Sequence, residues 1–292
     1  MRIGAHVSGS GGLLRTIERA VEIGAECAQI FVGAPQRWAG ASYSDQEVAD
    51  FRALAASHDV GPNVVHALYL VNLASLDLEL RERSVQALIT QMAWCDRLEA
   101  LGLVVHVGSS KGASSRAESI SAVVSGIERV LAATKQAMFL VENTAGMGES
   151  IGSDFADIGQ IIQQLGGDQR VGVCLDTAHT FEAGHDISTR DGLDSVLDSF
   201  DRLVGLDRLQ ALHANDSKTA FGSKVDRHEN IGRGHLGEDA FGYVMTHPAL
   251  QDQPFFLEVP GLAGKGPDSE NIDVLRRLAG LGPSPIWQAL TD

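Results

Sequence analysis

Residues 171–179 read VGVCLDTAH, an apolar run that is followed at once by an acid and then by a histidine. The run from Val171 to Leu175 has no charged residue, which is typical of a strand buried on both faces of a parallel sheet. Asp176 and His179 follow where such a strand would end. Seven further runs of this kind lie at residues 3–7, 27–32, 63–66, 103–107, 138–141, 209–213 and 255–258.

Longer amphipathic stretches separate these runs and predict helices. Residues 44–58 begin with Ser44 as a candidate N-cap, and Glu47 follows at the spacing of a capping box. Residues 78–101 carry apolar side chains near helical spacing and predict a helix that ends at Gly102. Residues 117–136, 153–165 and 191–204 follow the same pattern.

A strand followed by a helix, repeated eight times, is typical of a parallel α/β architecture. An open doubly wound sheet would also produce this alternation, but eight units favour a closed barrel. We therefore predict a single (β/α)8 TIM-barrel domain over residues 1–292, with the active site at the C-terminal ends of the strands. The long polar loop at residues 214–238 is expected to be functional or mobile.

Composition limits the class of protein. Of the 292 residues, 44% are hydrophobic and 21% are charged, so a sizeable core is expected. No apolar run approaches the roughly 18–20 residues of a membrane span, and residues 1–6 do not resemble a secretion signal. We therefore expect a cytoplasmic protein without membrane contact. Cys27, Cys95 and Cys174 form no C-x-x-C pair, so we expect them to be small buried hydrophobic residues.

The net charge of −15 argues against a polyanionic partner, because phosphate contacts favour lysine and arginine. Metal ligation would account for part of the acidity. Three bound Zn²⁺ ions would add six positive charges and leave a balance of about −9. If the partner is a nucleic acid, the remaining acidic residues must lie away from the binding face.

Histidines and acids gather at the ends of six of the predicted strands and in one following loop. In a barrel these ends converge on one mouth, so the side chains would share a pocket. Imidazole and carboxylate together suit Zn²⁺, or alternatively Mn²⁺ or Fe²⁺, and nine ligands are enough for two or three ions. The predicted ligands are His66, His106, Glu142, Asp176, His179, His213, Asp226, His228 and Glu258.

Each residue taken singly also has a purely structural interpretation. One histidine at a strand end is more often a satisfied polar residue, and one acid there is more often a helix N-cap. Several unpaired carboxylates in one mouth would cost several kcal/mol unless cations compensate them, which favours the metal site. His6 should face the same mouth, and the glycine-rich residues 8–12 form either an anion-binding nest or an ordinary turn.

At this point the motifs resemble those of the endonuclease IV family of DNA repair enzymes, over nearly the whole chain. They are GAHVS at residues 4–8, QRW at 36–38, YLVNL at 69–73 after His66, VENTAG at 141–146, LDTAH at 175–179, HANDSK at 213–218 and DRHENIG at 226–232. The last of these, with Gly234 and Gly237 beyond it, is the most specific.

The resemblance implies a trinuclear zinc enzyme that takes part in base excision repair. Such an enzyme cuts double-stranded DNA on the 5′ side of an abasic site, leaves a 3′-hydroxyl and removes blocking groups from 3′ ends. It also implies three ligand sets, namely His66, His106 and Glu142 for one ion, Glu142, Asp176, His213 and Glu258 for a second, and His179, Asp226 and His228 for the third.

The family's residue roles transfer to four positions. Glu142 would bridge two ions, and Glu258 would orient the attacking water as well as bind metal. Arg37 and Tyr69 match the motifs that insert an arginine and a tyrosine into the duplex at the lesion. A monomer is expected, and Mn²⁺ is an alternative ion.

Two positions depart from the family's usual sequence. After His106 the chain has Val107 and Gly108, where the family usually has Pro-Gly. After Glu258 it has Val259 and Pro260, where a threonine is common, so the hydrogen bonds around Glu258 must differ from the usual ones.

Two other functions are compatible with parts of this pattern. A sugar isomerase or epimerase on the same barrel would need one or two ions and about four ligands, so it would not use Asp226 and His228. A DNA-binding protein without catalytic activity is the second alternative, and an intact ligand set disfavours it because unused buried charges are costly.

Overall fold

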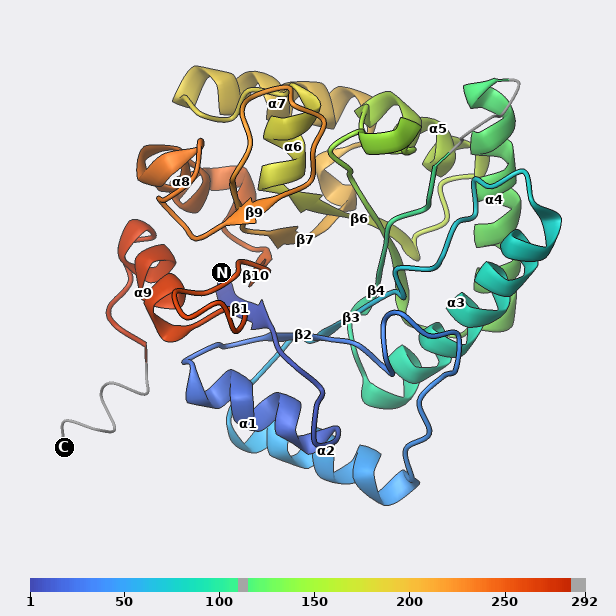
Figure 1. Ribbon diagram of the computed structural model, residues 1–292, viewed down its shortest axis with the longest axis horizontal. Coiled ribbons are helices and arrows are strands. Elements are labelled where there is room, and N and C mark those ends of the chain that lie inside the picture. The colour runs from blue at the N-terminus through green and yellow to red at the C-terminus, as the bar shows by residue number, and fades with distance from the viewer. Residues whose placement is uncertain (110–114, 285–292) are drawn as a thin grey trace.

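The computed structural model describes residues 1–109 and 115–284, and its strands close into a parallel barrel (Figure 1). The barrel strands are β1 (Arg2–His6), β2 (Ala28–Ile30), β3 (Val64–His66), β4 (Gly102–Val105), β5 (Met138–Glu142), β6 (Val171–Asp176), β7 (Leu209–His213) and β10 (Pro254–Leu257). Their order around the barrel is β1-β10-β7-β6-β5-β4-β3-β2. The prediction of a (β/α)8 barrel is confirmed, and residues 110–114 and 285–292 of the predicted domain lie outside the described residues.

Helices surround the barrel as an outer layer (Figure 1). They are α1 (Leu14–Glu22), α2 (Asp45–Ser57), α3 (Leu78–Leu98), α4 (Arg116–Ala133), α5 (Phe155–Gln164), α6 (Thr177–Ala183), α7 (Arg190–Leu203), α8 (Gly237–Thr246) and α9 (Ser269–Leu278). Short 3₁₀ turns lie at Met147–Glu149, Leu206–Arg208 and Pro248–Leu250. Among the described residues, no helix combines the length and apolarity that a membrane crossing would require.

The predicted start of α2 agrees with the structure, whereas the predicted end of α3 does not. The predicted capping box is confirmed, because Ser44 accepts from the Glu47 backbone N–H and Glu47 accepts from the Ser44 N–H. The prediction that α3 ends at Gly102 is wrong, because α3 ends at Leu98 and Glu99 adopts the left-handed conformation with φ of 54°. Gly102 instead begins β4, where an added Cβ would lie 2.4 Å from the Met138 carbonyl oxygen.

The barrel interior is built in layers, because alternate residues of a strand point to the same face. An apolar layer fills the centre and consists of Cys27, Val64, Val104, Leu140, Cys174, Ala211 and Phe256. Two residues further along each of these strands the chain carries a polar side chain. The larger apolar cluster combines strand residues that point away from the barrel centre with apolar helix residues, and it packs the strands against the helices.

The three cysteines are free and buried, as predicted. Cys27 and Cys174 belong to the apolar layer inside the barrel, and Cys95 lies on the buried side of α3. Burial raises the pKa of all three thiols, that of Cys174 to about 11. The thiols are therefore neutral and serve as small core residues.

The long loop after β7 has its own structure. It contains an antiparallel pair, β8 (Asp216–Ser217) with β9 (His228–Glu229), before α8 begins. The buried carboxylate of Asp216 accepts backbone N–H groups from Ser217, Gly234, Leu236 and Gly237 at 2.8–3.2 Å. These bonds anchor the loop that carries two of the predicted metal ligands.

Candidate metal centre

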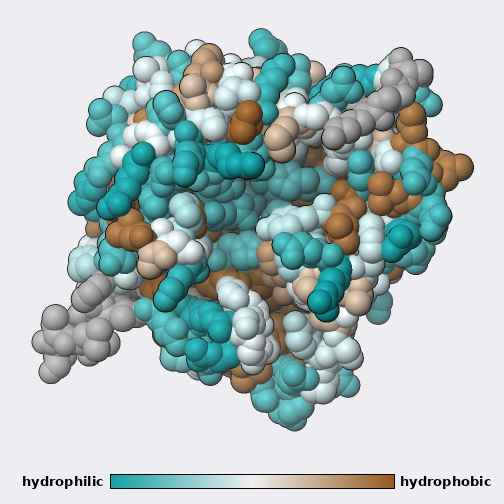
Figure 2. Space-filling model, viewed as in Figure 1, coloured by the Kyte–Doolittle hydropathy of each residue, from teal (hydrophilic) through white to brown (hydrophobic). Residues whose placement is uncertain are grey.

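One polar side chain from each barrel strand, or from the residue directly after it, forms a ring above the apolar layer. We call this set the polar ring, and it consists of His6, Gln29, His66, His106, Glu142, Asp176, His213 and Glu258. The ring lies at the base of a cavity of about 1320 Å³ at the C-terminal ends of the strands. Figure 2 shows a hydrophilic hollow in the middle of this face.

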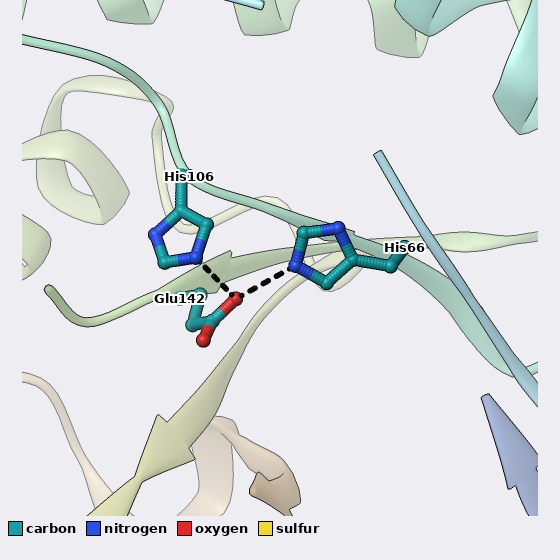
Figure 3. Close-up of side chains that lie close together, drawn as sticks. All are labelled: His66, His106 and Glu142. Atoms are coloured by element: carbon teal, nitrogen blue, oxygen red, sulfur yellow. Dashed lines mark hydrogen bonds and ion pairs between the residues drawn. The ribbon is translucent and has the colours of Figure 1, made fainter. Parts of the chain in front are cut away.

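The first group of side chains joins β3, β4 and β5. The Nε2 atoms of His66 and His106 lie 3.3 Å and 3.1 Å from the same oxygen, Oε2 of Glu142 (Figure 3). His66 Nδ1 donates to the Ala67 carbonyl oxygen at 2.8 Å, so in the neutral ring Nε2 keeps its lone pair. Two imidazole nitrogens and one carboxylate oxygen therefore converge on one point.

The second group uses the other oxygen of Glu142. His213 Nδ1 lies 2.9 Å from Glu142 Oε1, 3.6 Å from Asp176 Oδ2 and 3.4 Å from Glu258 Oε2. His213, Glu142 and Asp176 belong to barrel strands and are fully buried, and Glu258 directly follows β10. Because its two oxygens face different groups, Glu142 has the arrangement of a bridging carboxylate.

The third group combines α6 with the β8–β9 hairpin. His179 Nε2 lies 3.4 Å from His228 Nε2 and 3.4 Å from Asp226 Oδ1, and the last two atoms are 3.6 Å apart. Asp176 Oδ2 also lies 3.6 Å from His228 Nε2. Asp176 thus stands between the second and third groups, whereas the sequence had placed it in the second alone.

These distances fit metal coordination. A tetrahedral ion with ligands at about 2.0–2.2 Å places its ligand atoms about 3.3–3.6 Å from one another. Most of the nitrogen–oxygen and nitrogen–nitrogen separations within the three groups are 3.3–3.6 Å and match this spacing. His106 and His213 lie closer to Glu142, at the hydrogen-bond distances of 3.1 Å and 2.9 Å. Eight of the nine predicted side chains, all except Asp226, form clusters that are able to hold metal ions. Asp226 Oδ1 lies 3.4 Å from His179 Nε2 and 3.6 Å from His228 Nε2, beside the third group.

The electrostatics of the site balance buried acids against histidines. Burial by itself would raise the pKa of Glu142, but the surrounding histidines hold it well below its usual value. Burial opposes the charge on His179 and His213, yet neighbouring anionic groups raise the pKa of both rings well above the ordinary value of 6.5. In metal-free protein, protons on these rings therefore offset the carboxylates.

The raised histidine pKa values predict a pH-dependent stability of the metal-free protein. A histidine whose pKa is higher in the folded state than in the unfolded state adds to the free energy of unfolding. This contribution is fully present below the unfolded-state pKa of about 6.5 and is lost as the pH rises through the folded-state pKa. We expect the Tm of metal-free protein to fall as the pH rises above about 6.5, since the contribution of the acids is constant above about pH 4.5. Zinc-loaded protein should show a flatter profile, because ions replace the protons.

Thermal unfolding followed by circular dichroism at each pH would test this expectation, with zinc-loaded protein in the same buffers as the comparison. A metal-free Tm that stayed constant or rose across that range would contradict the proposed balance of charges.

Two asparagines that the sequence did not single out hold the ligand side chains. Asn215 Nδ2 donates to Asp176 Oδ2, and its Oδ1 accepts the Glu258 backbone N–H, both at 2.7 Å. Asn143 Oδ1 accepts the Asp176 backbone N–H at 2.6 Å. Both residues lie within two positions of a predicted ligand, and that proximity is the signal in the sequence that would have found them.

The two positions that depart from the family's usual sequence are supported by other contacts. Val107 is buried, and its carbonyl oxygen accepts N–H groups from Leu73 at 3.0 Å and Ala74 at 3.3 Å. This strand end is therefore tied to the neighbouring loop without a proline. Val259 is also buried. The Glu258 backbone N–H donates to Asn215 Oδ1, and the Glu258 carboxylate contacts His6 Nδ1 and accepts from Gln29 Nε2.

The two predicted DNA-binding residues are placed differently. Tyr69 lies on the cavity wall, is 62% exposed and packs edge-on against Phe31 and His66. Partial desolvation at the cavity wall and the nearby carboxylates raise the pKa of Tyr69 to about 12. Arg37 is exposed in the adjacent loop and is not among the described residues that line the cavity. The Tyr69 N–H donates to the Pro35 carbonyl oxygen at 3.0 Å, which joins the two loops.

A closed parallel barrel with histidines and carboxylates at its mouth defines a class, the xylose isomerase-like TIM barrels, and the model of that family matches residues 17–278. A solved D-tagatose 3-epimerase-like protein shares the fold, with a TM-score of 0.70 and 16% identity over 100% of both chains.

Other relatives are much more similar to this chain. A probable endonuclease 4 of Halothermothrix orenii is 40% identical over 95% of this chain and 100% of its own length. The crystal structure of endonuclease IV from Thermus thermophilus matches 96% of this chain and 99% of its own, with a TM-score of 0.85 and 35% identity. The chain belongs to the endonuclease IV family, also called endonuclease 4.

Proposed function

We propose that residues 1–292 act as one domain and as a monomer that hydrolyses double-stranded DNA on the 5′ side of abasic sites and leaves a 3′-hydroxyl. We further propose that the same site removes blocking groups from 3′ ends. The observation that carries this proposal is the joining of three ligand groups by Glu142 and Asp176 in one cavity. Family membership supports it.

The nine side chains would hold three zinc ions, with Mn²⁺ as an alternative, in the sets His66–His106–Glu142, Glu142–Asp176–His213–Glu258 and His179–Asp226–His228. Such ions lower the pKa of water towards about 7 and offset charge on a phosphate in its transition state. Glu142 would fix the positions of two of these ligand sets relative to each other, because its one planar carboxylate faces both sets. Glu258, on the cavity wall, would also orient the attacking water.

The distribution of charge supports a DNA surface at the mouth despite the net charge of −15. Exposed cations occur in the loops that follow the strands, namely Arg37, Lys218, Lys224, Arg227, Arg233 and Lys265. An exposed acidic stripe lies instead on α7 at the periphery of the barrel, formed by Asp191, Asp194, Asp198 and Asp201. Phosphate contacts would therefore form at the mouth and away from this stripe.

Lesion selectivity would follow from the cost of extruding a nucleotide. A site without a base has already lost stacking and pairing, so its extrusion into the cavity costs less than that of an intact nucleotide, by up to a few kcal/mol. Tyr69, exposed at the cavity wall, would fill the gap in the stack, and Arg37 would contact the duplex beside it.

Replacement of Tyr69 by alanine is expected to weaken binding to an abasic duplex by about 1–3 kcal/mol, since that is the contribution of one aromatic stacking contact. Zinc content should not change, because Tyr69 is not among the proposed ligands. Tyr243→Ala is the matched control, because Tyr243 packs against Arg190 on the outside of the barrel. Fluorescence anisotropy with a labelled duplex would measure the effect, and equal affinity for both variants would exclude the stacking role.

The central test uses two duplexes that differ only in one abasic site, with zinc measured on the same protein sample. We expect one cut, on the 5′ side of the lesion, with a 3′-hydroxyl that a DNA polymerase can extend. Absence of cutting by zinc-loaded protein would overturn the proposal and favour a non-catalytic DNA-binding role.

A sugar epimerase on the same fold is the alternative. The similarity to the epimerase-like structure is a similarity of fold, at 16% identity. The third group, His179 with Asp226 and His228, exceeds the needs of a site with one or two ions and favours the phosphodiesterase.

A further inference from the structure

We propose that Gln29 is a positioning residue that orients His213 and Glu258, and thereby secures the ion held by the second group. The inference rests on the proposed metal site. It concerns a residue that supplies no metal ligand itself and that the ligand pattern in the sequence did not reveal.

The strand register places Gln29 in the polar ring. It is the middle residue of β2, opposite His6 on one side and Val64 on the other, and its side chain is fully buried. Its strand neighbours Ala28 and Ile30 pack outward against the helices, so Gln29 points into the barrel. Seven strands carry a histidine or an acid at this level, and β2 carries an amide.

The amide of Gln29 makes two short hydrogen bonds to the second group. Its Oε1 lies 2.8 Å from His213 Nε2, and its Nε2 donates to Glu258 Oε1 at 2.5 Å. The reversed amide would set an oxygen against the Glu258 carboxylate and an N–H against the ring nitrogen. The neighbours therefore select one orientation of the amide.

This orientation determines which atoms the two ligands offer. Because Gln29 Oε1 can only accept, His213 must donate from Nε2, which leaves its Nδ1 to face Glu142, Asp176 and Glu258. Because Gln29 Nε2, together with His6 Nδ1, contacts Glu258 Oε1, Glu258 Oε2 is the oxygen that faces His213 Nδ1, at 3.4 Å. One side chain thus aligns a nitrogen and an oxygen on the same point.

Bonds of this kind to metal ligands are worth about 10–100-fold in metal affinity. We expect Gln29→Met to lose one equivalent of zinc to a competing chelator at a concentration about 10–100-fold lower than wild type requires. The remaining zinc should be retained as in wild type, because the hydrogen bonds of the Gln29 side chain within the described residues go to His6, His213 and Glu258. The measurement is zinc per chain after equilibration with graded chelator, with Tm recorded alongside.

Two further variants separate positioning from a general loss of packing. Gln91→Met also replaces a buried glutamine, one whose Oε1 accepts the Leu68 N–H, and should keep all its zinc. Gln29→Asn is polar and smaller, so it should fold, yet it is too short to reach both partners and should lose the same equivalent.

Selective loss in both Gln29 variants, and not in Gln91→Met, would support the inference. Wild-type zinc retention in a folded Gln29→Met or Gln29→Asn protein would overturn it while the proposed function stood, provided wild type still incised. Wild-type protein that bound no zinc would overturn both.

Discussion

Glu142→Gln is expected to reduce incision at an abasic site by about 1000-fold or more, equivalent to roughly 4 kcal/mol of transition-state stabilisation. Glu142 is the only one of the nine side chains whose two oxygens face two different ligand groups among the described residues. An amide keeps the shape but removes the negative charge that both groups share. It also sets N–H groups against nitrogens that should bind metal.

The fold should survive this substitution. The carboxylate is fully buried among histidines, and glutamine fits the same space. Far-UV circular dichroism should therefore match wild type, while zinc per chain should fall together with incision.

The matched control for this variant is Glu182→Gln. Glu182 is a buried glutamate on α6 whose Oε1 accepts from the hydroxyls of Ser217 and Thr219 and from the Arg227 backbone N–H, and not from the nine side chains. Glu182→Gln keeps that acceptor and should retain most of the activity. Wild-type incision by Glu142→Gln would remove the bridging role from the mechanism.

Complete metal removal is expected to abolish incision and to lower the Tm by more than about 10 °C, which is the effect of losing a single ion. Each ion that binds the folded chain at a thousandfold excess over its Kd contributes about 4 kcal/mol of stability, and each kcal/mol corresponds to about 2–4 °C in a chain of this size. The four acids of the site would then be balanced by protonated histidines alone.

The experiment uses extended chelation, removal of the chelator and elemental analysis of the product. Added zinc should restore both incision and Tm, which distinguishes metal loss from irreversible damage. Undiminished activity in protein verified to be metal-free would end the metal mechanism.

Much of the site could be predicted because ligand residues follow strand ends in this fold. His66, Glu142 and Asp176 each lie two residues beyond an apolar side chain that fills the barrel centre, so strand periodicity alone points them to the mouth. His179 follows on the first turn of α6. Asp226 and His228 were predicted from their place in the loop after the seventh strand, and the family resemblance then assigned them to the third ion.

Other features depended on contacts between distant parts of the chain. The sequence predicted the end of α3 at Gly102, but Gly102 is required by the close approach of Met138 from the next strand. The position of Asp176 between two groups depends on how the β8–β9 hairpin folds over the mouth.

The amino-acid sequence by itself determined the alternation of strands and helices and the ring of polar side chains, because both follow from local periodicity and the two-residue repeat of a strand. Only the tertiary structure decided which atoms meet within that ring. Gln29 and His213 are 184 positions apart, and their hydrogen bond exists because barrel closure brings β2 and β7 to opposite sides of one cluster at the same level. Such contacts depend on the register of all the intervening strands, which no short stretch of sequence encodes.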